Sequence, residues 1–202
     1  MSFRKERKYR ITISEYSELL ANLEKKGMAP IYVTRTVNSV YFDNINYEMY
    51  FQSEEGTLPR KKIRVRWYEA FNVFKLEKKV SSIEGRHKSS QDLHQLQKQE
   101  NICLLNLFDS DYGSLIPVLH VSYQRSYYKL ESMRLTFDKN IRYRSLRSNN
   151  GLTFDDNERV MEIKVPAHFG DDTIEKNIPF STSRFSKYCR GVRMSQQIST
   201  QA

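Results

Sequence analysis

The sequence predicts an α+β protein, mainly β, whose strands close into an eight-stranded antiparallel β-barrel with a charged interior and flanking helices. Three observations support this prediction. Eight segments alternate as strands do, almost every one carries charges at every second position, and only three segments have helical spacing. Side chains two apart in a strand point to the same face, so each strand would have one charged and one apolar face.

The first elements are a strand in RKYRITI (residues 7–13) and a helix in SEYSELLANLEKKG (residues 14–27). Ser14 is the expected N-cap and Gly27 follows the expected end of the helix. The apolar residues of this segment recur at helical spacing: Tyr16, Leu19, Leu20 and Leu23.

Seven further strands follow from their content of Val, Ile, Tyr, Phe and Thr. They are Val33–Phe42, Arg60–Trp67, Phe74–Val80, Leu119–Tyr128, Arg134–Asp138, Ile141–Arg144 and Arg159–Val165. The spacing predicts two more helices, over about Ser90–Phe108 and Ser183–Arg190. The stretch SLRSNNGLTFDDNER (residues 145–159) has the composition of a mobile loop.

Length and composition narrow the class of protein. A chain of 202 residues with 39% hydrophobic content predicts a single domain over residues 1–202. The net charge of +9 predicts an anionic partner: a phosphate compound, nucleic acid or an acidic membrane surface. The sequence has no long apolar segment typical of a spanning helix or signal peptide, so we expect a soluble cytoplasmic protein. Cys103 and Cys189 are expected to be buried thiols of helices rather than a disulfide or zinc ligands.

The stretch RKKIRVRWY (residues 60–68) concentrates positive charge on one strand face. Its alternate positions are Arg60, Lys62, Arg64 and Arg66. Stacked like charges repel, so water, facing carboxylates or a bound polyanion must compensate. For this stretch alone, a solvated edge strand is the simpler interpretation.

A second pattern recurs in three strands, where Glu and Lys stand two apart. The pairs are Glu6 and Lys8, Glu77 and Lys79, and Glu162 and Lys164. A half-exposed sheet or a sandwich would turn such faces to solvent, whereas a barrel would enclose them in a water-filled tunnel. Because Arg, Lys and Glu dominate these faces over Ser, Thr, Asn and Gln, the pattern favours the tunnel.

Cations with a few carboxylates suit a complex of a metal ion with phosphates. Glu oxygens hold hard divalent ions such as Mg or Mn, while Arg and Lys bind phosphate oxygens. Phosphoryl transfer requires little more than positioned cations, a metal ion and an aligned acceptor. The sequence has no Gly-rich phosphate loop, and a tunnel does not require one.

Eight motifs occur in order along the chain: ERKY, SVYFDN, RKKIRVRWY, LEKK, SYQRSYY, LTFDKNIRYR, VMEIKVP and RFSKYCRGV. Residues 81–118 and 145–158 are left without such a motif. Together the eight motifs resemble the VTC domain, the polyphosphate polymerase branch of the triphosphate tunnel metalloenzymes in the CYTH-like superfamily. The resemblance implies an eight-stranded antiparallel tunnel and a divalent metal, Mn or Mg. It also implies transfer of the γ-phosphate of ATP to a growing polyphosphate chain.

The resemblance also assigns site residues. The implied phosphate-binding cations are Lys8, Arg64, Arg66, Lys79, Arg125 and Lys187, of which Lys187, Arg64 and Arg66 would be catalytic. Glu162 matches the metal-binding carboxylate. Glu6, Glu77 and Asp138 are expected to face the same way and to support the metal. Simpler interpretations remain: Glu162 could be a salt-bridge partner of Lys164, and Lys187 a surface lysine of a helix.

Three functions are therefore compatible with the sequence. They are synthesis of polyphosphate from ATP, hydrolysis of tripolyphosphate or a nucleoside triphosphate, and non-catalytic binding of polyphosphate. The expected partners are ATP, polyphosphate or another triphosphate, and no motif indicates sequence-specific recognition of nucleic acid. Because no membrane segment follows Val192, we expect that transport of a product either falls to a separate partner at the inner face of a membrane or does not occur.

Overall fold

The computed structural model describes residues 4–96, 98–147, 151, 153–166 and 168–199. Contacts within the chain divide it into two compact units, which are described one at a time. Unit 1 comprises residues 1–35, 123–141 and 156–185, and unit 2 comprises residues 36–122, 142–155 and 186–202. The expectation of a single domain over residues 1–202 stays a prediction.

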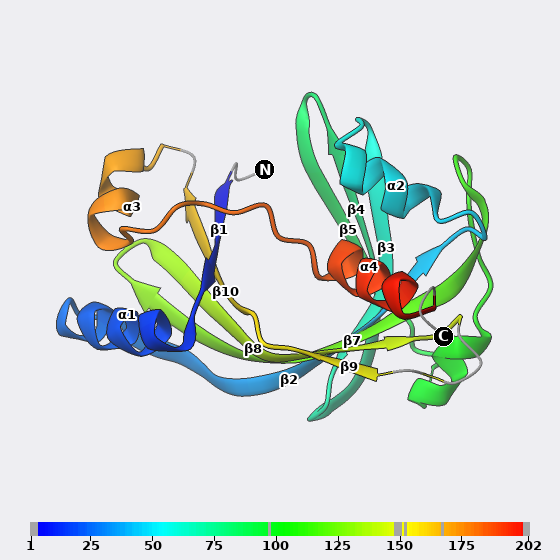
Figure 1. Cartoon of the computed structure of the whole chain (residues 1–202), viewed down its shortest axis with the longest axis horizontal. Helices are drawn as coiled ribbons and strands as arrows, with labels where there is room; N and C mark the ends of the chain where they lie inside the picture. The colour runs from blue at the N-terminus through cyan, green and yellow to red at the C-terminus, as the bar shows by residue number, and fades with distance from the viewer. Residues whose placement is uncertain (1–3, 97, 148–150, 152, 167, 200–202) are drawn as a thin grey trace. The chain divides into compact units, whose positions relative to one another are not determined.

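Unit 1 is built on one end of the long strands and carries two helices (Figure 1). Its complete elements are β1 (Arg4–Ile11), α1 (Ile13–Lys25), β10 (Arg159–Pro166) and α3 (Asp171–Asn177). Three strands continue into unit 2: β2 (Ala29–Asp43), β7 (Gly113–Leu130) and β8 (Met133–Ser145).

Unit 2 contains the other ends of those strands and a β-meander (Figure 1). Its strands are β3 (Arg60–Tyr68), β4 (Phe71–Ser82), β5 (Gly85–Asp92), β6 (Leu107–Asp109) and most of β9 (Thr153–Asp156). Its helices are α2 (Glu48–Glu55), the 3₁₀ helix η1 (Gln99–Leu104) and α4 (Lys187–Ser199). None of the helices among the described residues has the length and apolar character needed to cross a bilayer.

The strands form one sheet in the order β1-β10-β8-β7-β2-β3-β4-β5, with β6 beside β7 and β9 beside β8. The mainly β, antiparallel architecture is confirmed. The closed barrel was wrong, because the described strands form an open path with β1 and β5 at its edges. Closure requires the edge strands to pair, and β5 (GRHKSSQD) is exposed over most of its length and carries Arg, His and Lys, which oppose edge pairing.

Strand β3, the basic stretch, is internal to the sheet because β2 and β4 pair with it on either side. Its alternate residues Ile63, Val65 and Trp67 are buried in the core of unit 2, as the two-residue period predicted. The edge-strand interpretation of this stretch was wrong. Its cations therefore lie on the second face of a central strand, where neighbouring strands supply their partners.

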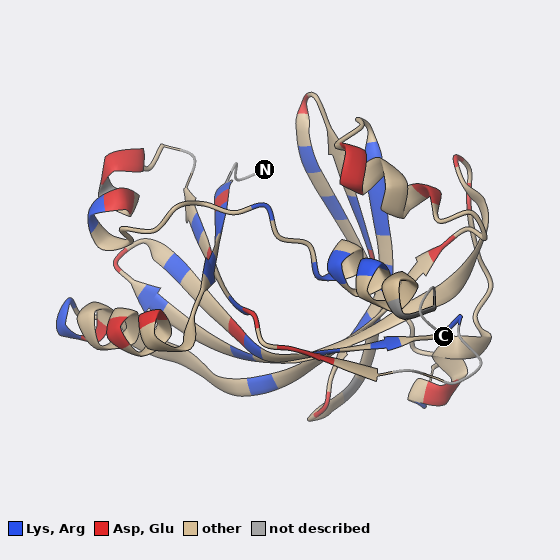
Figure 2. Ribbon diagram, viewed as in Figure 1, with Lys and Arg blue, Asp and Glu red and all other residues tan. Residues whose placement is uncertain are grey.

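Each unit has its own hydrophobic core on one face of the sheet. In unit 1, helices α1 and α3 contribute to a cluster that includes Tyr9, Leu19, Leu23, Leu135, Phe137, Met161, Ile163, Ile174 and Ile178. In unit 2, a cluster includes Val40, Phe42, Met49, Ile63, Val65, Trp67, Ile102 and Leu115. Figure 2 shows acidic residues on α1 and α3 and basic residues along β3, β4 and β5. The remaining face of each unit's strands is left to charged side chains.

Helix α1 begins at Ile13, because its N-cap is Thr12, two residues before Ser14. Thr12 and Glu15 form a reciprocal capping box, which satisfies two backbone N–H groups at once. The predicted Ser14 cap was therefore wrong. Gly27 follows the helix with a φ of 92°, a left-handed conformation that glycine adopts at low cost.

The helix predicted over Ser90–Phe108 was wrong. Residues up to Asp92 form β5, which pairs with β4 through a tight turn at Gly85. Of the residues that the structure describes in this stretch, only η1 is helical. Pairing of the β5 residues with β4 has outweighed the helical spacing of the apolar residues in this stretch. Consequently Cys103 is exposed, against expectation, whereas Cys189 is a buried thiol as predicted.

In the C-terminal half, several predicted elements form, but their bounds differ from the prediction. The two strands predicted at Arg134–Asp138 and Ile141–Arg144 are one strand, β8. Within the stretch expected to be a mobile loop, residues 153–156 form β9, and residues 148–150 and 152 lie outside the described residues. Helix α4 begins at Lys187 rather than Ser183 and runs to Ser199.

Replacing Gly191 in α4 tests how tightly this helix packs on unit 2. An alanine Cβ there would lie 2.6 Å from Leu119 Cδ2 and 2.6 Å from Tyr143 Cδ1, closer than van der Waals contact allows. We expect Gly191→Ala to lower the free energy of unfolding by about 1–3 kcal/mol, the usual cost of overpacking. Urea denaturation measures this change, with Gln197→Ala at an exposed position of the same helix as the control. Equal stability of the two variants would contradict the close packing.

Candidate functional site

A row of polar side chains crosses four strands of unit 2. Tyr41 on β2 lies opposite Arg64 on β3, Arg64 lies opposite Glu77 on β4, and Glu77 lies opposite Ser90 on β5. Directly opposed residues of antiparallel strands share one face and touch, so the register itself brings the arginine and the glutamate together.

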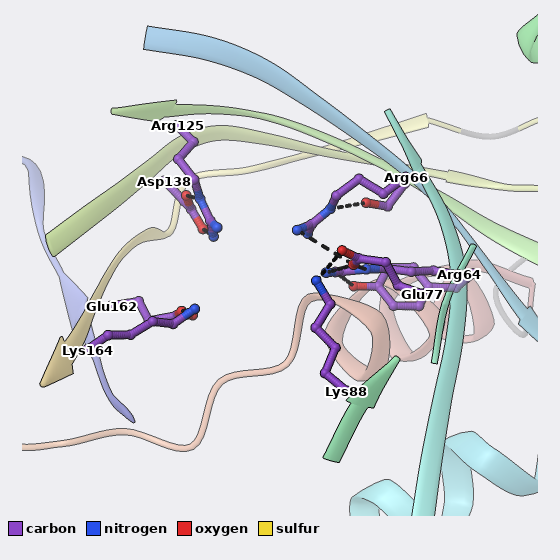
Figure 3. A network of polar contacts seen from close by, with 10 residues as sticks. Arg64, Arg66, Glu77, Lys88, Arg125, Asp138, Glu162 and Lys164 are labelled. Atoms are coloured by element: carbon purple, nitrogen blue, oxygen red, sulfur yellow. Dashed lines mark hydrogen bonds and ion pairs between the residues drawn. The ribbon is translucent and has the colours of Figure 1, made fainter. Parts of the chain in front are cut away.

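Glu77 is the centre of this row, with an exposed fraction of 4%. Its Oε2 accepts hydrogen bonds from Arg64 Nε at 2.8 Å and Arg64 Nη2 at 2.6 Å, and lies 3.8 Å from Arg66 Nη1 (Figure 3). Its Oε1 accepts from Lys88 Nζ on β5. Burial raises the pKa of Glu77, but Arg64, Arg66 and Lys88 together hold it well below its ordinary value. Glu77 is therefore a carboxylate at all ordinary pH values.

The cations around Glu77 outnumber it. Arg64 and Arg66 are largely shielded from solvent, with side-chain exposures of 11% and 13%, and Arg66 Nε also donates to Ser39 Oγ at 3.3 Å. One carboxylate among three cations leaves an excess of positive charge. Such an excess in a poorly solvated place attracts an anion, and planar guanidinium groups suit the paired oxygens of phosphate.

The start of helix α4 adds further cations to unit 2. Ser186 precedes the helix, and its Oγ accepts from the N–H of Cys189 at 3.3 Å and from Lys62 Nζ at 2.9 Å. Lys187, the predicted catalytic lysine, is the first residue of α4 and is half-buried. A helix begins with partial positive charge, so the chain places lysines where the helix already favours an anion.

Lys79 lies on β4, opposite Lys62 on β3 and Lys88 on β5, and its side chain is exposed. Arg64, Arg66, Lys79 and Lys187 are therefore all residues of unit 2, and the first three share the charged face of β3 and β4.

Unit 1 contains a second charged cluster. Arg125 on β7 donates from Nε to Asp138 Oδ1 at 2.6 Å and from Nη2 to Asp138 Oδ2 at 2.7 Å, a two-bond pair (Figure 3). Burial lowers the pKa of Arg125, but Asp138, Tyr123 and Glu162 raise it well above the ordinary value. Asp138, only 2% exposed, holds the guanidinium in one orientation.

Glu162 on β10 faces the same side of unit 1. It lies opposite Lys8 on β1 and Thr136 on β8, and its Oε1 is 2.9 Å from Lys164 Nζ. Burial raises the pKa of Glu162, but Lys164, Arg125 and Lys8 together hold it far below the ordinary value.

The other residues predicted on this side of unit 1 flank Glu162. Lys8 Nζ donates to the backbone oxygen of Phe185 at 2.9 Å, and Glu6 is half-buried opposite Lys164. Thus Lys8, Arg125, Glu162 and Glu6 belong to one face of one unit.

Glu162 and Glu77 differ in how well their contacts suit binding of a divalent metal ion. Among the described residues, no three His, Cys, Asp or Glu side chains form a group that could hold a metal ion. Glu162 fits a metal held jointly by one carboxylate, phosphate oxygens and water, an arrangement common for Mg. Both oxygens of Glu77 accept from cations, so its contacts favour holding Arg64 over binding metal.

Sequence reasoning missed Lys88, Ser39 and Asp43. Lys88 stands in a segment without a motif, and its only signal was the spacing of Arg86, Lys88 and Ser90 on one face of a hairpin strand. Asp43 was part of the quoted motif SVYFDN, but nothing in the spacing indicated its contacts with helix starts.

Comparison with solved structures defines the class of fold. A candidate adenylate cyclase from Bacillus halodurans is 17% identical, with a TM-score of 0.60 over 92% of this chain and 94% of that one. A Pyrococcus furiosus protein is 14% identical, with a TM-score of 0.57 over 93% and 99%. A candidate adenylyl cyclase from Hippeastrum, described with a dominant triphosphatase activity, is 15% identical, with a TM-score of 0.52 over 92% and 93%. The chain therefore shares its antiparallel fold with these three proteins.

The family follows from a more specific match. The model of the VTC domain matches residues 3–196, so the chain belongs to the VTC domain family. This confirms the resemblance of the eight ordered motifs. A search of curated proteins found no match.

Glu77→Gln tests whether this carboxylate stabilises unit 2 through its cations. A carboxylate whose pKa is lowered in the folded state stabilises the protein above its ordinary pKa of about 4.3, and this stabilisation is lost as pH falls. We expect the free energy of unfolding of the wild type to fall more steeply than that of Glu77→Gln from about pH 5 to pH 3.

At pH 7 the variant should be less stable by about 1–3 kcal/mol, because buried cations lose their partner. Urea denaturation across this pH range gives both quantities. Glu18→Gln, at an exposed position of α1, is the matched control. Parallel pH profiles of the wild type and Glu77→Gln would show that Glu77 stabilises nothing.

Proposed function

We propose that the protein is a metal-dependent polyphosphate polymerase, which transfers the γ-phosphate of ATP to a growing polyphosphate chain. The match of the VTC domain to residues 3–196 carries this proposal, because the motifs that define the resemblance imply that reaction. The two charged faces support it, since each holds guanidinium groups in fixed orientations.

In this reaction, an oxygen at the end of polyphosphate would attack the γ-phosphorus of ATP, and the bond from that phosphorus to the β,γ-bridging oxygen would break, releasing ADP. The chain's part is to bind and orient phosphate oxygens. In unit 2 we assign this role to Arg64, Arg66, Lys79 and Lys187, and in unit 1 to Lys8 and Arg125. Arg64 and Arg125 are pre-oriented, because Glu77 and Asp138 each bind two of their nitrogens.

Glu162, with Glu6 as a neighbour on β1, would hold Mn or Mg together with the phosphates. When bound, the ion would neutralise the negative charge that builds up on the transferring phosphate. The carboxylate of Glu162 is ready for this role, because its low pKa keeps it ionised.

A hydrolase is the second candidate. The Hippeastrum protein with the same fold is described with a dominant triphosphatase activity, which favours water as an alternative acceptor. A non-catalytic polyphosphate-binding module is the third. As part of the same proposal, the protein acts in the cytoplasm at the inner face of a membrane, beside a separate membrane partner.

The reaction products decide among these candidates. We expect purified protein, incubated with ATP and Mn or Mg, to form long phosphate chains that a gel resolves by length. Lys187→Ala should abolish them, because Lys187 is the proposed lysine at the reacting phosphates, and Lys25→Ala on α1 should not. Orthophosphate as the sole product would instead indicate a triphosphatase, and unchanged ATP with bound polyphosphate would indicate a binding module.

Glu162→Gln separates metal binding from phosphate binding. The substitution removes the charge that would hold the ion and leaves the cations of both units in place. We expect metal-dependent turnover to fall by at least about tenfold while polyphosphate binding without metal is retained. Turnover titrated with Mn and binding measured by calorimetry check this, with Glu24→Gln on α1 as the control. An unchanged metal dependence would remove Glu162 from the proposed metal site.

A further inference from the structure

Tyr41 links the central arginine of unit 2 to its C-terminal helix. Its side chain is buried, and its hydroxyl accepts a hydrogen bond from Arg64 Nη1 at 2.9 Å. Its ring stacks on the ring of Tyr188 in α4, with centroids 5.0 Å apart and an interplanar angle of 20°. Tyr41 therefore touches the phosphate-binding candidate with its polar end and the helix with its ring.

The hydroxyl of Tyr41 adds to the contacts with Glu77 that orient Arg64. Arg64 Nε and Nη2 both donate to Glu77 Oε2, which fixes one edge of the guanidinium. Nη1 lies on the other edge and donates to Tyr41. A phenylalanine would pack on Tyr188 as well as a tyrosine does, so packing alone does not explain the hydroxyl.

Tyr188 is itself held firmly by Asp43 on β2. Asp43 is fully buried, and its carboxylate accepts from the backbone N–H groups of Met49 at 3.1 Å and Tyr50 at 3.0 Å, in the first turn of α2. The hydroxyl of Tyr188 donates to the same carboxylate. Because Lys187 directly precedes Tyr188, these contacts fix the start of α4 against β2 within unit 2.

We propose that Tyr41 is a positioning residue, whose hydroxyl holds the Arg64 guanidinium for phosphate binding and whose ring ties that arginine to the helix start carrying Lys187. This inference rests on the proposed phosphate-binding function and adds to it a residue that no phosphate oxygen needs to touch. Loss of the hydroxyl removes one of the contacts that orient the guanidinium, so binding becomes weaker while the fold is kept.

The charges that face Tyr41 also make its effect on anion affinity depend on pH. They come from β3, β4 and α4 and belong to Lys62, Arg64, Arg66, Glu77 and Tyr188. Burial alone raises the pKa of Tyr41, but the arginines and the lysine together lower it to about 8. Ionised Tyr41 would cancel one positive charge beside Arg64, so the affinity of the wild type for an anion should fall above about pH 8 relative to a variant without the hydroxyl.

Calorimetric titration with tripolyphosphate tests the proposal. At pH 7 we expect Tyr41→Phe to bind about three- to tenfold more weakly than the wild type, the effect of one lost hydrogen bond. The matched control is Tyr112→Phe, which removes the hydroxyl hydrogen bond from Tyr112 to Gln52. Thermal unfolding should show similar midpoints for all three proteins. Between pH 7 and pH 9 the difference between the wild type and Tyr41→Phe should shrink.

A double-mutant cycle shows whether Tyr41 acts through Arg64. In the Arg64→Ala background, Tyr41→Phe should have no further effect on the affinity. If Tyr41→Phe fails to fold, the pH profiles of the wild type and Arg64→Ala decide, because without Arg64 the loss of affinity should begin at a higher pH.

The failure of the inference and the failure of the proposed function are distinguishable. Tripolyphosphate binding by the wild type with equal affinities for Tyr41→Phe and Tyr112→Phe overturns the inference alone. An equal loss on Tyr41→Phe with and without Arg64, or identical pH profiles of the wild type and Arg64→Ala, also overturns it. A wild type that binds no tripolyphosphate overturns the proposed function first, and the inference with it.

Discussion

A guanidinium group that is shielded from water needs a fixed acceptor, and this requirement organises the charged face of each unit. In unit 2, Glu77 binds Arg64 with one oxygen and Lys88 with the other. In unit 1, Asp138 binds Arg125 with both oxygens. Glu77 lies on β4 next to β3, and Asp138 lies on β8 next to β7. Strand pairing rather than loop geometry therefore sets the positions of the two arginines.

The same strands keep charge and core apart. On β10, Met161 and Ile163 lie in the core of unit 1, whereas Glu162 between them lies among cations. On β3, Ile63 and Val65 lie in the core of unit 2, whereas Arg64 between them binds Glu77. A shift of one residue in pairing would bury the charges and expose the core, so the hydrophobic pattern fixes the charged clusters as well.

This coupling explains which parts of the fold could be predicted. The two-residue period is strong in β3, β8 and β10. The sequence predicted the charged faces of all three, with β8 predicted as two strands instead of one. It could not predict β5, because GRHKSSQD has no apolar face and becomes a strand only by pairing with β4. The closed barrel was wrong for a related reason, since closure depends on edge pairing that no local pattern determines.

For the candidate site, the sequence identified the cations better than the groups that hold them. Arg64, Arg66 and Arg125 stand in motifs with regular spacing, whereas the contact between Asp43 and Tyr188 joins residues 145 positions apart. The role of Lys88 could not be predicted from spacing, because the residues around it on β5 are polar on both faces of the strand.

The place of Lys88 on β5 makes the charge balance of unit 2 depend on an edge strand. An edge strand is hydrogen-bonded on one side only, so its backbone can open locally at a lower free energy than the central strands require. When β5 opens, Lys88 leaves Glu77 with only the arginines, and the net positive charge on this face falls by one. The local opening of β5 therefore affects both amide hydrogen exchange in the hairpin and the electrostatic potential around Arg64.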